Sequence, residues 1–334
     1  MPTPPVRRST PGSARRRLDA VLKAPDWPGT VQRPEPEPTL GVDYDTSWTR
    51  SRPARIARAM LVDNVARPLT RVVARPKVIG LDKLDPIEGP VIFAANHASH
   101  LDTGIVVCSL PVRFRHHTIV AAAADHFFDR RWKAALWSFS LASIPIERTK
   151  VNRRSADLAA ELLEDGWSLL IFPEGGRSPD GWGQEFRGGA AYLAKRCRVP
   201  VVPLHLHGVR PLLPKGGSRL SPGPVELRIG DPLVPLEAEA PNARGEDARR
   251  FSARIESAVA TLADESETDW WAARRRRAAG ETPDLRGPAS SPWRRAWELA
   301  ESARAHRPRD DAKPSRPREG SGYGGGAPRR QRPW

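Results

Sequence analysis

The chain has 334 residues, a formal net charge of +15 and an apolar fraction of 39%, with 35 prolines and 26 glycines concentrated toward its ends. This composition favours one folded domain with unstructured tails over two domains. Cys108 and Cys197 lack Cys-x-x-Cys spacing, which excludes a disulfide scaffold and a cysteine-bound metal, and no run of 18 apolar residues predicts a membrane-spanning helix.

The first segment, residues 1–40, predicts a disordered N-terminal tail, because it contains nine prolines and a run of arginines without apolar periodicity. No apolar segment follows these arginines, so we expect no secretory signal. The absence of a disulfide pattern favours a reducing compartment.

Residues 41–78 predict a basic amphipathic helical segment with a kink or break at Pro68. Apolar side chains recur at near-helical spacing, at Ile56, Met60, Leu61, Val65, Leu69, Val72 and Val73. Arginines lie between them, at Arg52, Arg55, Arg58, Arg67, Arg71 and Arg75. Such a helix can lie on an anionic bilayer, or it can pack its apolar face on the core and leave its arginines in solvent.

The most informative stretch begins with an apolar run at residues 91–95, which predicts a buried strand and leads into Asn96, His97 and an apolar helix. Ser99 and Asp102 have the spacing of a capping box, so we expect the helix to begin at Ser99 and His97 to lie just outside it. The Asp102 carboxylate can then hold the imidazole and raise its basicity, as a general base for an alcohol requires. Alternatively, Asp102 only caps the helix and His97 is an ordinary turn residue.

A second strand is predicted at residues 117–124 and an aromatic-rich helix at 125–141. A short apolar stretch then ends in Glu147 and Arg148. An arginine at a strand end can bind a phosphate through two parallel charge-assisted bonds. Arg148 can equally pair with Glu147 or face solvent.

A glycine-containing turn follows the next predicted helix and strand, at residues 152–165 and 167–172. Gly175 and Gly176 allow backbone N–H groups to approach an anion, and Arg177 adds a fixed charge. Glu174 can orient that arginine or accept a hydrogen bond from a substrate hydroxyl. Taken alone, this stretch is merely a turn.

The remaining elements of the domain are predicted as a helix at 190–196, strands at 199–206 and 225–229, and a helix at 246–262. Pro200 and Pro203 suit a central strand poorly, so we expect the strand at 199–206 to be bulged or at an edge. His205 and His207 alternate with leucines, but no third ligand has a recognisable spacing, so we expect no metal site.

The C-terminal part changes character at about Ser266. Residues 266–304 predict a Trp/Arg-rich helical extension, which suits a membrane interface or a single-stranded nucleic acid. Residues 305–334 predict a disordered tail.

Four of these motifs, in order and at plausible spacings over about residues 80–235, resemble those of the 1-acylglycerol-3-phosphate (lysophosphatidic acid) acyltransferases of the glycerolipid acyltransferase superfamily. They are the Asn-His-x-Ser-x-x-Asp pattern at 96–102, the stretch ending at Arg148, the Pro-Glu-Gly-Gly-Arg-Ser turn at 173–178, and Val-Pro-Leu at 202–204. One departure is Gly176, where the family usually has threonine. It puts in doubt the geometry of the acceptor site more than the reaction class.

The resemblance implies transfer of an acyl group from acyl-CoA or acyl-carrier protein to the free hydroxyl of a lysophospholipid phosphate, without a cofactor or metal. It implies His97 and Asp102 as the catalytic pair. The substrate-binding residues that it implies are Asn96, Ser99, Arg148, Glu174, Gly175, Gly176, Arg177 and Pro203. An anionic membrane surface is an expected partner and nucleic acid is not, so we expect a cytoplasmic protein attached peripherally to the inner face of the plasma membrane.

We therefore expect an α/β fold, with a mixed, largely parallel sheet flanked by helices and a catalytic domain at residues 79–265. A serine hydrolase is disfavoured because no Gly-x-Ser-x-Gly elbow occurs. Two alternatives remain open: the same chemistry on glycerol 3-phosphate, a glycolipid or an amino-acid lipid, and a non-enzymatic binder of anionic lipid or nucleic acid.

Overall fold

The computed structural model describes residues 40–147, 153–177, 182–213, 220–236, 246–287 and 293. Within them, one seven-stranded sheet has the order β1-β7-β6-β2-β5-β3-β4. Its strands are β1 (Pro76–Ile79), β2 (Ile92–Ala95), β3 (Thr118–Ala123), β4 (Ser143–Ile146), β5 (Ser168–Ile171), β6 (Val201–His207) and β7 (Val225–Ile229). All neighbours pair in parallel except β6 and β7, which confirms the predicted fold class.

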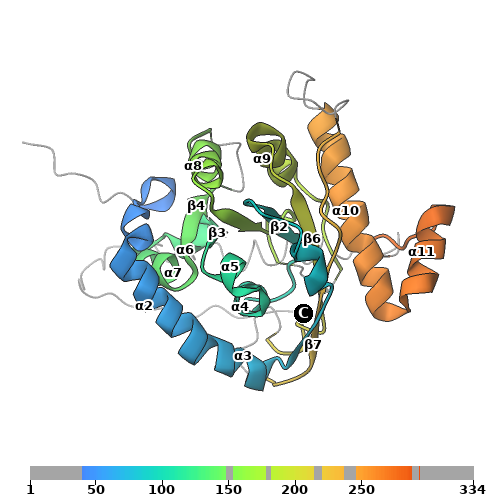
Figure 1. The fold of residues 1–334 in the computed structure, drawn as a ribbon, viewed down its shortest axis with the longest axis horizontal. Coiled ribbons are helices and arrows are strands. Elements are labelled where there is room, and N and C mark those ends of the chain that lie inside the picture. The colour runs from blue at the N-terminus through green and yellow to red at the C-terminus, as the bar shows by residue number, and fades with distance from the viewer. Residues whose placement is uncertain are drawn as a thin grey trace, which may run out of the picture.

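Helices cover both faces of this sheet (Figure 1). The helices are α2 (Arg52–Leu61), α3 (Arg67–Val73), α4 (Asp102–Ser109), α5 (Val112–Arg115), α6 (Ala124–Phe127), α7 (Arg131–Leu141), α8 (Arg153–Glu164), α9 (Gly189–Cys197), α10 (Glu246–Glu267) and α11 (Trp270–Ala279). Buried side chains of α4 and α5 form the core on one face, and those of α8, α9 and α10 form the core on the other.

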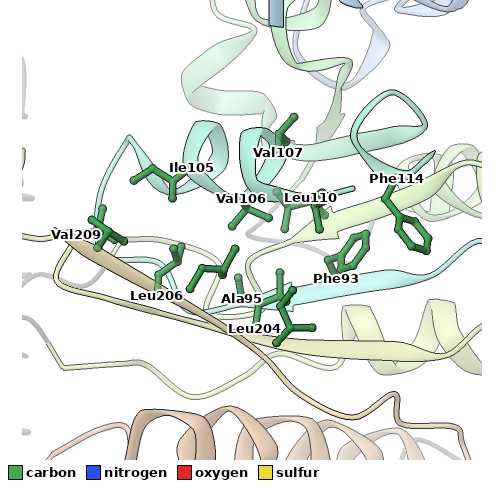
Figure 2. Close-up of a cluster of buried hydrophobic side chains, with 14 of the residues drawn as sticks. Phe93, Ala95, Ile105, Val106, Val107, Leu110, Phe114, Leu204, Leu206 and Val209 are labelled. Carbon is green, nitrogen blue, oxygen red and sulfur yellow. The ribbon is translucent and has the colours of Figure 1, made fainter. Parts of the chain in front are cut away.

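Strand β2 lies near the middle of the sheet and is buried on both faces. Phe93 and Ala95 belong to the core under α4, whereas Ile92 and Ala94 belong to the opposite core, as the two-residue period of a strand requires. All four side chains are 0% exposed. Figure 2 shows Val106 of α4 packed above this part of the sheet. The residues that follow β2 therefore leave a rigid support.

Within the predicted amphipathic segment, residues 52–73 form one continuous helical rod, in which a π-helical turn at Val62–Ala66 joins α2 to α3 (Figure 1). The rod runs through Pro68 without breaking. A proline has no N–H and clashes with the carbonyl four residues earlier in an α-helix, and the wider π turn just before Pro68 relieves both problems.

Most of the apolar face of this rod points into solvent. The exposed fractions are 62% for Ile56, 63% for Met60, 55% for Val65, 60% for Leu69 and 70% for Val72. Arg58, by contrast, is 6% exposed and donates a hydrogen bond to the Thr49 carbonyl at 2.9 Å. The alternative in which the apolar face packs on the core is therefore wrong for these five side chains.

The π turn is what aligns those side chains. In an uninterrupted α-helix Met60 and Val72 would be about 120° apart around the axis, at about 100° per residue. One extra residue accommodated in the π turn shifts the later residues by about 100°, which brings Val72 to about 20° from Met60. The insertion thus converts two apolar patches into one face.

Strand β6 is central, between β7 and β2, so the prediction of an edge or bulged strand is wrong. The Pro203 carbonyl accepts from the Gly230 N–H at 2.8 Å on the β7 side, just beyond the first β6–β7 residue pair, Leu204 with Ile229. The missing Pro203 N–H would point to the same side, so its absence leaves the pairing with β2 intact.

Other differences are local. Strand β1 was not predicted, and the helix expected at 125–141 is split into α6 and α7. The closing helix α10 extends to Glu267, and α11 is the described part of the C-terminal extension. Most of both predicted tails lies outside the described residues, among which no helix is long and apolar enough to span a bilayer.

Candidate active site

The candidate site lies where three neighbouring parallel strands, β2, β5 and β3, end at the same edge of the sheet. The turn after β2 carries His97, the turn after β5 carries Glu174 and Arg177, and α6, directly after β3, carries His126. Open α/β sheets bind ligands at the carboxyl ends of their strands.

The predicted His97–Asp102 pair is formed. Nδ1 of His97 lies 2.9 Å from Oδ2 of Asp102, and the same oxygen accepts the N–H groups of Ala98 at 2.7 Å and Ser99 at 2.8 Å. The Asp102 side chain is 0% exposed, and among the described residues its Oδ1 has no hydrogen-bond partner. With the carboxylate as acceptor, the proton belongs on Nδ1, so Nε2 is the nitrogen left for chemistry.

Helix α4 begins at Asp102, three residues later than the capping-box spacing predicts. The Asp102 carboxylate reaches back to the Ser99 N–H as in a capping box, but the Ser99 hydroxyl lies 3.3 Å from the Leu101 nitrogen and 3.2 Å from the Leu213 carbonyl. Residues 98–101 therefore form a non-helical turn. Because they do, the side chain of Asp102 can face His97, which an unbroken helix would prevent.

The His97 imidazole stacks on Phe172 at the end of β5, with ring centroids 4.2 Å apart and an interplanar angle of 23°. Its side chain is 18% exposed, so the ring is packed on one side and open on another. The phenyl ring and the carboxylate together leave the imidazole little freedom to rotate.

Glu174 connects the two turns. Its side chain is 2% exposed; Oε1 accepts from the His97 N–H at 2.8 Å, and Oε2 accepts from the Gln184 N–H at 3.0 Å. Burial raises the pKa of Glu174 to about 8, against the opposing effect of these two donors. Both oxygens thus bond to the main chain, while the predicted contacts with Arg177 or a substrate hydroxyl stay predictions.

Asn96 and Ser99 also bond to the main chain. Asn96 donates through Nδ2 to the Leu206 carbonyl at 3.0 Å and accepts through Oδ1 from the Leu206 N–H at 2.7 Å, which extends the β2–β6 pairing by one residue. The Ser99 hydroxyl donates to Leu213. Direct contact of these two residues with substrate stays a prediction.

In the turn after β5, Gly175 has a φ of +73°, and a Cβ there would lie 2.8 Å from Nε of Arg187. The backbone and the neighbour both require glycine. The Gln184 side-chain amide donates to the carbonyls of Gly176 and Arg177, each at 3.3 Å. Arg177 lies close enough to His100 for its positive charge to lower the pKa of that imidazole.

Two predicted site residues lie apart from this group. Arg148 lies outside the described residues, so its phosphate contact stays a prediction. Pro203 is buried within β6 against Gly230, where an added Cβ would come within 2.7 Å of the proline ring. Its role in shaping a substrate pocket also stays a prediction.

The sequence patterns predict no role in the site for Gln184 or Phe172. Gln184 belongs to no recognisable motif, and Phe172 is predicted only as the end of a strand.

A hollow of about 680 Å³ opens beside Glu174. It is lined by Glu174, Gln184, Glu185, Phe186, Arg187, Gly188, Arg249, Ser252, Ala253 and Glu256. In the described ranges no group of three His, Cys, Asp or Glu side chains is placed to hold a metal ion.

Comparisons with known proteins find relatives over the part of the chain that carries this site. A family model described as Acyltransferase matches residues 75–207. A 1-acyl-sn-glycerol-3-phosphate acyltransferase of Pseudomonas aeruginosa is 32% identical over 203 residues, which cover 58% of this chain and 73% of that protein. The human enzyme named alpha is 26% identical over 196 residues, covering 58% of this chain and 66% of that one.

The chain spans about half the length of some relatives, such as one from Chlamydomonas reinhardtii that is 32% identical over 47% of this chain and 46% of its own. The crystal structure of a 1-acyl-sn-glycerophosphate acyltransferase from Thermotoga maritima aligns with a TM-score of 0.46 and 24% identity, covering 63% of this chain and 82% of that one. From the extent of the bacterial match and the matched family model, we conclude that the chain belongs to the 1-acyl-sn-glycerol-3-phosphate acyltransferase family.

Proposed function

We propose that the protein transfers a fatty acyl group from acyl-CoA or acyl-carrier protein to the free hydroxyl of 1-acylglycerol 3-phosphate, giving phosphatidic acid. The observation that carries this proposal is the 2.9 Å contact between His97 Nδ1 and a fully buried carboxylate. The substrate class is taken from the relatives, which are named 1-acyl-sn-glycerol-3-phosphate acyltransferases.

The chemistry needs one base and no covalent acyl-enzyme. Nε2 of His97 takes the proton of the acceptor hydroxyl as its oxygen attacks the thioester carbonyl carbon. The C–S bond then breaks, and the thiolate takes the proton back from the imidazolium. Asp102 holds the ring in the required tautomer and stabilises its charged form.

The acceptor has to be held by its phosphate, so that its hydroxyl meets the imidazole. Arg177 lies at the same edge of the sheet as His97 and supplies a planar, permanently charged donor group. Arg148 is the second arginine proposed for this role. Positioning of this kind lowers a reaction barrier by several kcal/mol, roughly, because the entropy of encounter is removed beforehand.

The test is release of free thiol from acyl-CoA in the presence of 1-acylglycerol 3-phosphate, compared between wild type and His97→Ala. We expect the variant to lose activity by on the order of a thousandfold, the range of general-base catalysis. His117→Ala is the matched control, because His117 is exposed at the opposite, amino end of β3. Undiminished turnover by His97→Ala would refute the base assignment.

The acceptor is tested separately, since Gly176 replaces the usual threonine of the family. The same assay with glycerol 3-phosphate, a lysoglycolipid and an amino-acid lipid in place of 1-acylglycerol 3-phosphate identifies it. A higher kcat/KM for one of these acceptors would replace the proposed substrate while keeping the chemistry.

We also propose that the protein is cytoplasmic and attaches peripherally to an anionic membrane, the inner face of the plasma membrane. The aligned apolar face of α2 and α3, flanked by the exposed Arg52, Arg71 and Arg75, supports this attachment. Apolar side chains can enter the acyl boundary while the guanidinium groups meet anionic headgroups.

Vesicle sedimentation tests the attachment. Val72→Asn should lower partitioning to anionic vesicles by roughly tenfold, from the lost burial of one valine. Val234→Asn is the control, because Val234 is 58% exposed elsewhere on the surface. Equal partitioning of wild type to anionic and neutral vesicles would remove the electrostatic part of the proposal.

A further inference from the structure

Two exposed histidines beside the candidate active site belong to no motif. His100 lies in the non-helical turn between β2 and α4, and His126 lies in α6 after β3. Their rings are nearly parallel, with centroids 6.0 Å apart and an interplanar angle of 12°. They are called the imidazole pair here. His100 follows β2 and His126 follows β3, and β5 lies between these two strands in the sheet. The pair therefore connects the turn after β2 with α6 at the same edge of the sheet.

Basic groups surround His100 from each element that faces it. His97 approaches from its own turn, His126 from α6, and Arg177 from the turn after β5, and the charge of each opposes protonation of His100. Partial burial, reinforced by these charges, lowers the pKa of His100 to about 4. Asp125, next to His126 in α6, is exposed. This edge therefore gathers basic side chains beside the proposed base, and among the groups named Arg177 carries a permanent positive charge.

We propose that the imidazole pair, together with Arg177, binds a phosphomonoester group of a substrate. A dianion placed at a shared edge of the two stacked rings would accept an in-plane N–H hydrogen bond from each imidazole and a further bond from the guanidinium. This inference rests on the proposed function, because it names the group that holds the substrate in that reaction. Two substrates carry such a group: the acceptor, at its glycerol phosphate, and acyl-CoA, at its 3′-phosphate.

Binding of a dianion has a consequence that a neutral ligand would not share. The charges that now oppose protonation of His100 would be offset, so its pKa rises on binding and a proton is taken up. Affinity for the phosphorylated substrate should then increase as the pH falls from about 8 to about 6, in the range where a histidine titrates.

The first experiment uses NMR of histidine-labelled full-length protein and glycerol 3-phosphate as the probe. We expect the His100 titration to move to higher pH when the probe is added, and the His117 titration to stay unchanged. This readout does not need turnover, so it tests the pair even if the proposed acyl transfer fails. A His100 titration that ignores the probe would overturn the proposal.

The second experiment measures steady-state kinetics of His100→Gln, His126→Gln and the control His117→Gln. We expect each of the first two variants to raise the KM of the phosphorylated substrate by roughly tenfold, the worth of one charge-assisted bond. In both variants the KM should also no longer depend on pH. The kcat at saturation should fall by a smaller factor than the KM rises, since neither ring is the proposed base and Arg177 remains to hold the phosphate.

The arms of this experiment separate the two sources. A higher KM for 1-acylglycerol 3-phosphate alone assigns the acceptor phosphate to the pair. A higher KM for acyl-CoA, which disappears with a dephospho-CoA thioester, assigns the donor. KM values unchanged for both substrates, in folded variants with wild-type melting temperatures, would overturn the proposal.

Discussion

The two turns at the carboxyl edge of the sheet differ in whether they are closed by a side chain of their own. In the first turn, residues 96–102, one Asp102 oxygen accepts from His97, Ala98 and Ser99, in addition to the bonds that attach the turn to Glu174 and Leu206. The second turn, residues 173–177, is held from outside, by Gln184 and by the close approach of Arg187. A turn closed by its own carboxylate fixes a reacting atom. A turn held by distant segments can change shape with them, which suits the binding of variable substrates.

Removing the internal carboxylate tests the first turn and should have the largest effect. In Asp102→Asn the side chain can no longer accept from Nδ1 as an anion, so the imidazole loses both its preferred tautomer and the stabilisation of its charged form. We expect kcat to fall by roughly two to four orders of magnitude, with KM for the acceptor nearly unchanged. A loss confined to KM would contradict the difference between the turns.

Glu174→Gln cuts the connection between the turns and should have the next largest effect. A glutamine can accept from one of the two main-chain donors, but its amide group opposes the other. We expect kcat to fall by roughly ten- to a hundredfold through displacement of His97. Wild-type kcat in this variant would show that the turns act independently.

The same variant predicts a pH dependence of stability. The pKa of Glu174 is raised from an ordinary value of 4.5 to about 8, so the folded state keeps a proton that the unfolded state loses between these limits. The free energy of unfolding of wild type should therefore decrease relative to Glu174→Gln as the pH rises from about 4.5 to about 8, by up to about 1.4 kcal/mol per pH unit. Urea denaturation at several pH values checks this, and parallel curves would contradict it.

Gly175→Ala perturbs the second turn alone. A Cβ would collide with the Arg187 side chain and occupy a left-handed backbone conformation, at a cost of about 1–3 kcal/mol. We expect a lower Tm and a KM for the acceptor raised by several fold, with a smaller change in kcat. Gly188→Ala is the control, because a Cβ there meets nothing within 4 Å.

Asn96→Ala should have the smallest effect on activity. It removes two bonds to Leu206 that attach the first turn to β6, and leaves the His97–Asp102 contact in place. We expect about 1–3 kcal/mol lower stability with activity within roughly tenfold of wild type. Activity as low as that of His97→Ala would assign Asn96 a role in the reaction itself.

What could be predicted from sequence follows the same division. His97 and Asp102 are five residues apart, and the strand that precedes them is uniformly apolar, so their contact follows from local pattern. Glu174 meets the His97 backbone from 77 residues away, and no local pattern encodes that contact. The contact forms because β2 and β5 lie side by side and bring the turns that follow them together.

Two further misses have physical causes. Proline rules predict an edge or bulged strand for β6, but they do not say on which side the missing N–H would point. Here it points to the β7 side, in the gap between the Leu204–Ile229 pair and the isolated Val201–Leu233 bridge. The π turn at Val62–Ala66 escapes a fixed 100° periodicity, so the sequence shows an amphipathic segment without showing that its apolar face is outward.

The pairing of β1 with β7 links the early part of the chain to a late one. Among the described strands, Pro76–Ile79 pairs in register with Val225–Ile229 alone, so β1 gains its partner in the sheet after nearly 150 residues more have left the ribosome. During synthesis, the helical rod that precedes β1 is complete long before its anchoring strand can dock. A nascent chain thus exposes the apolar face of α2 and α3 first and completes the outer border of its sheet last.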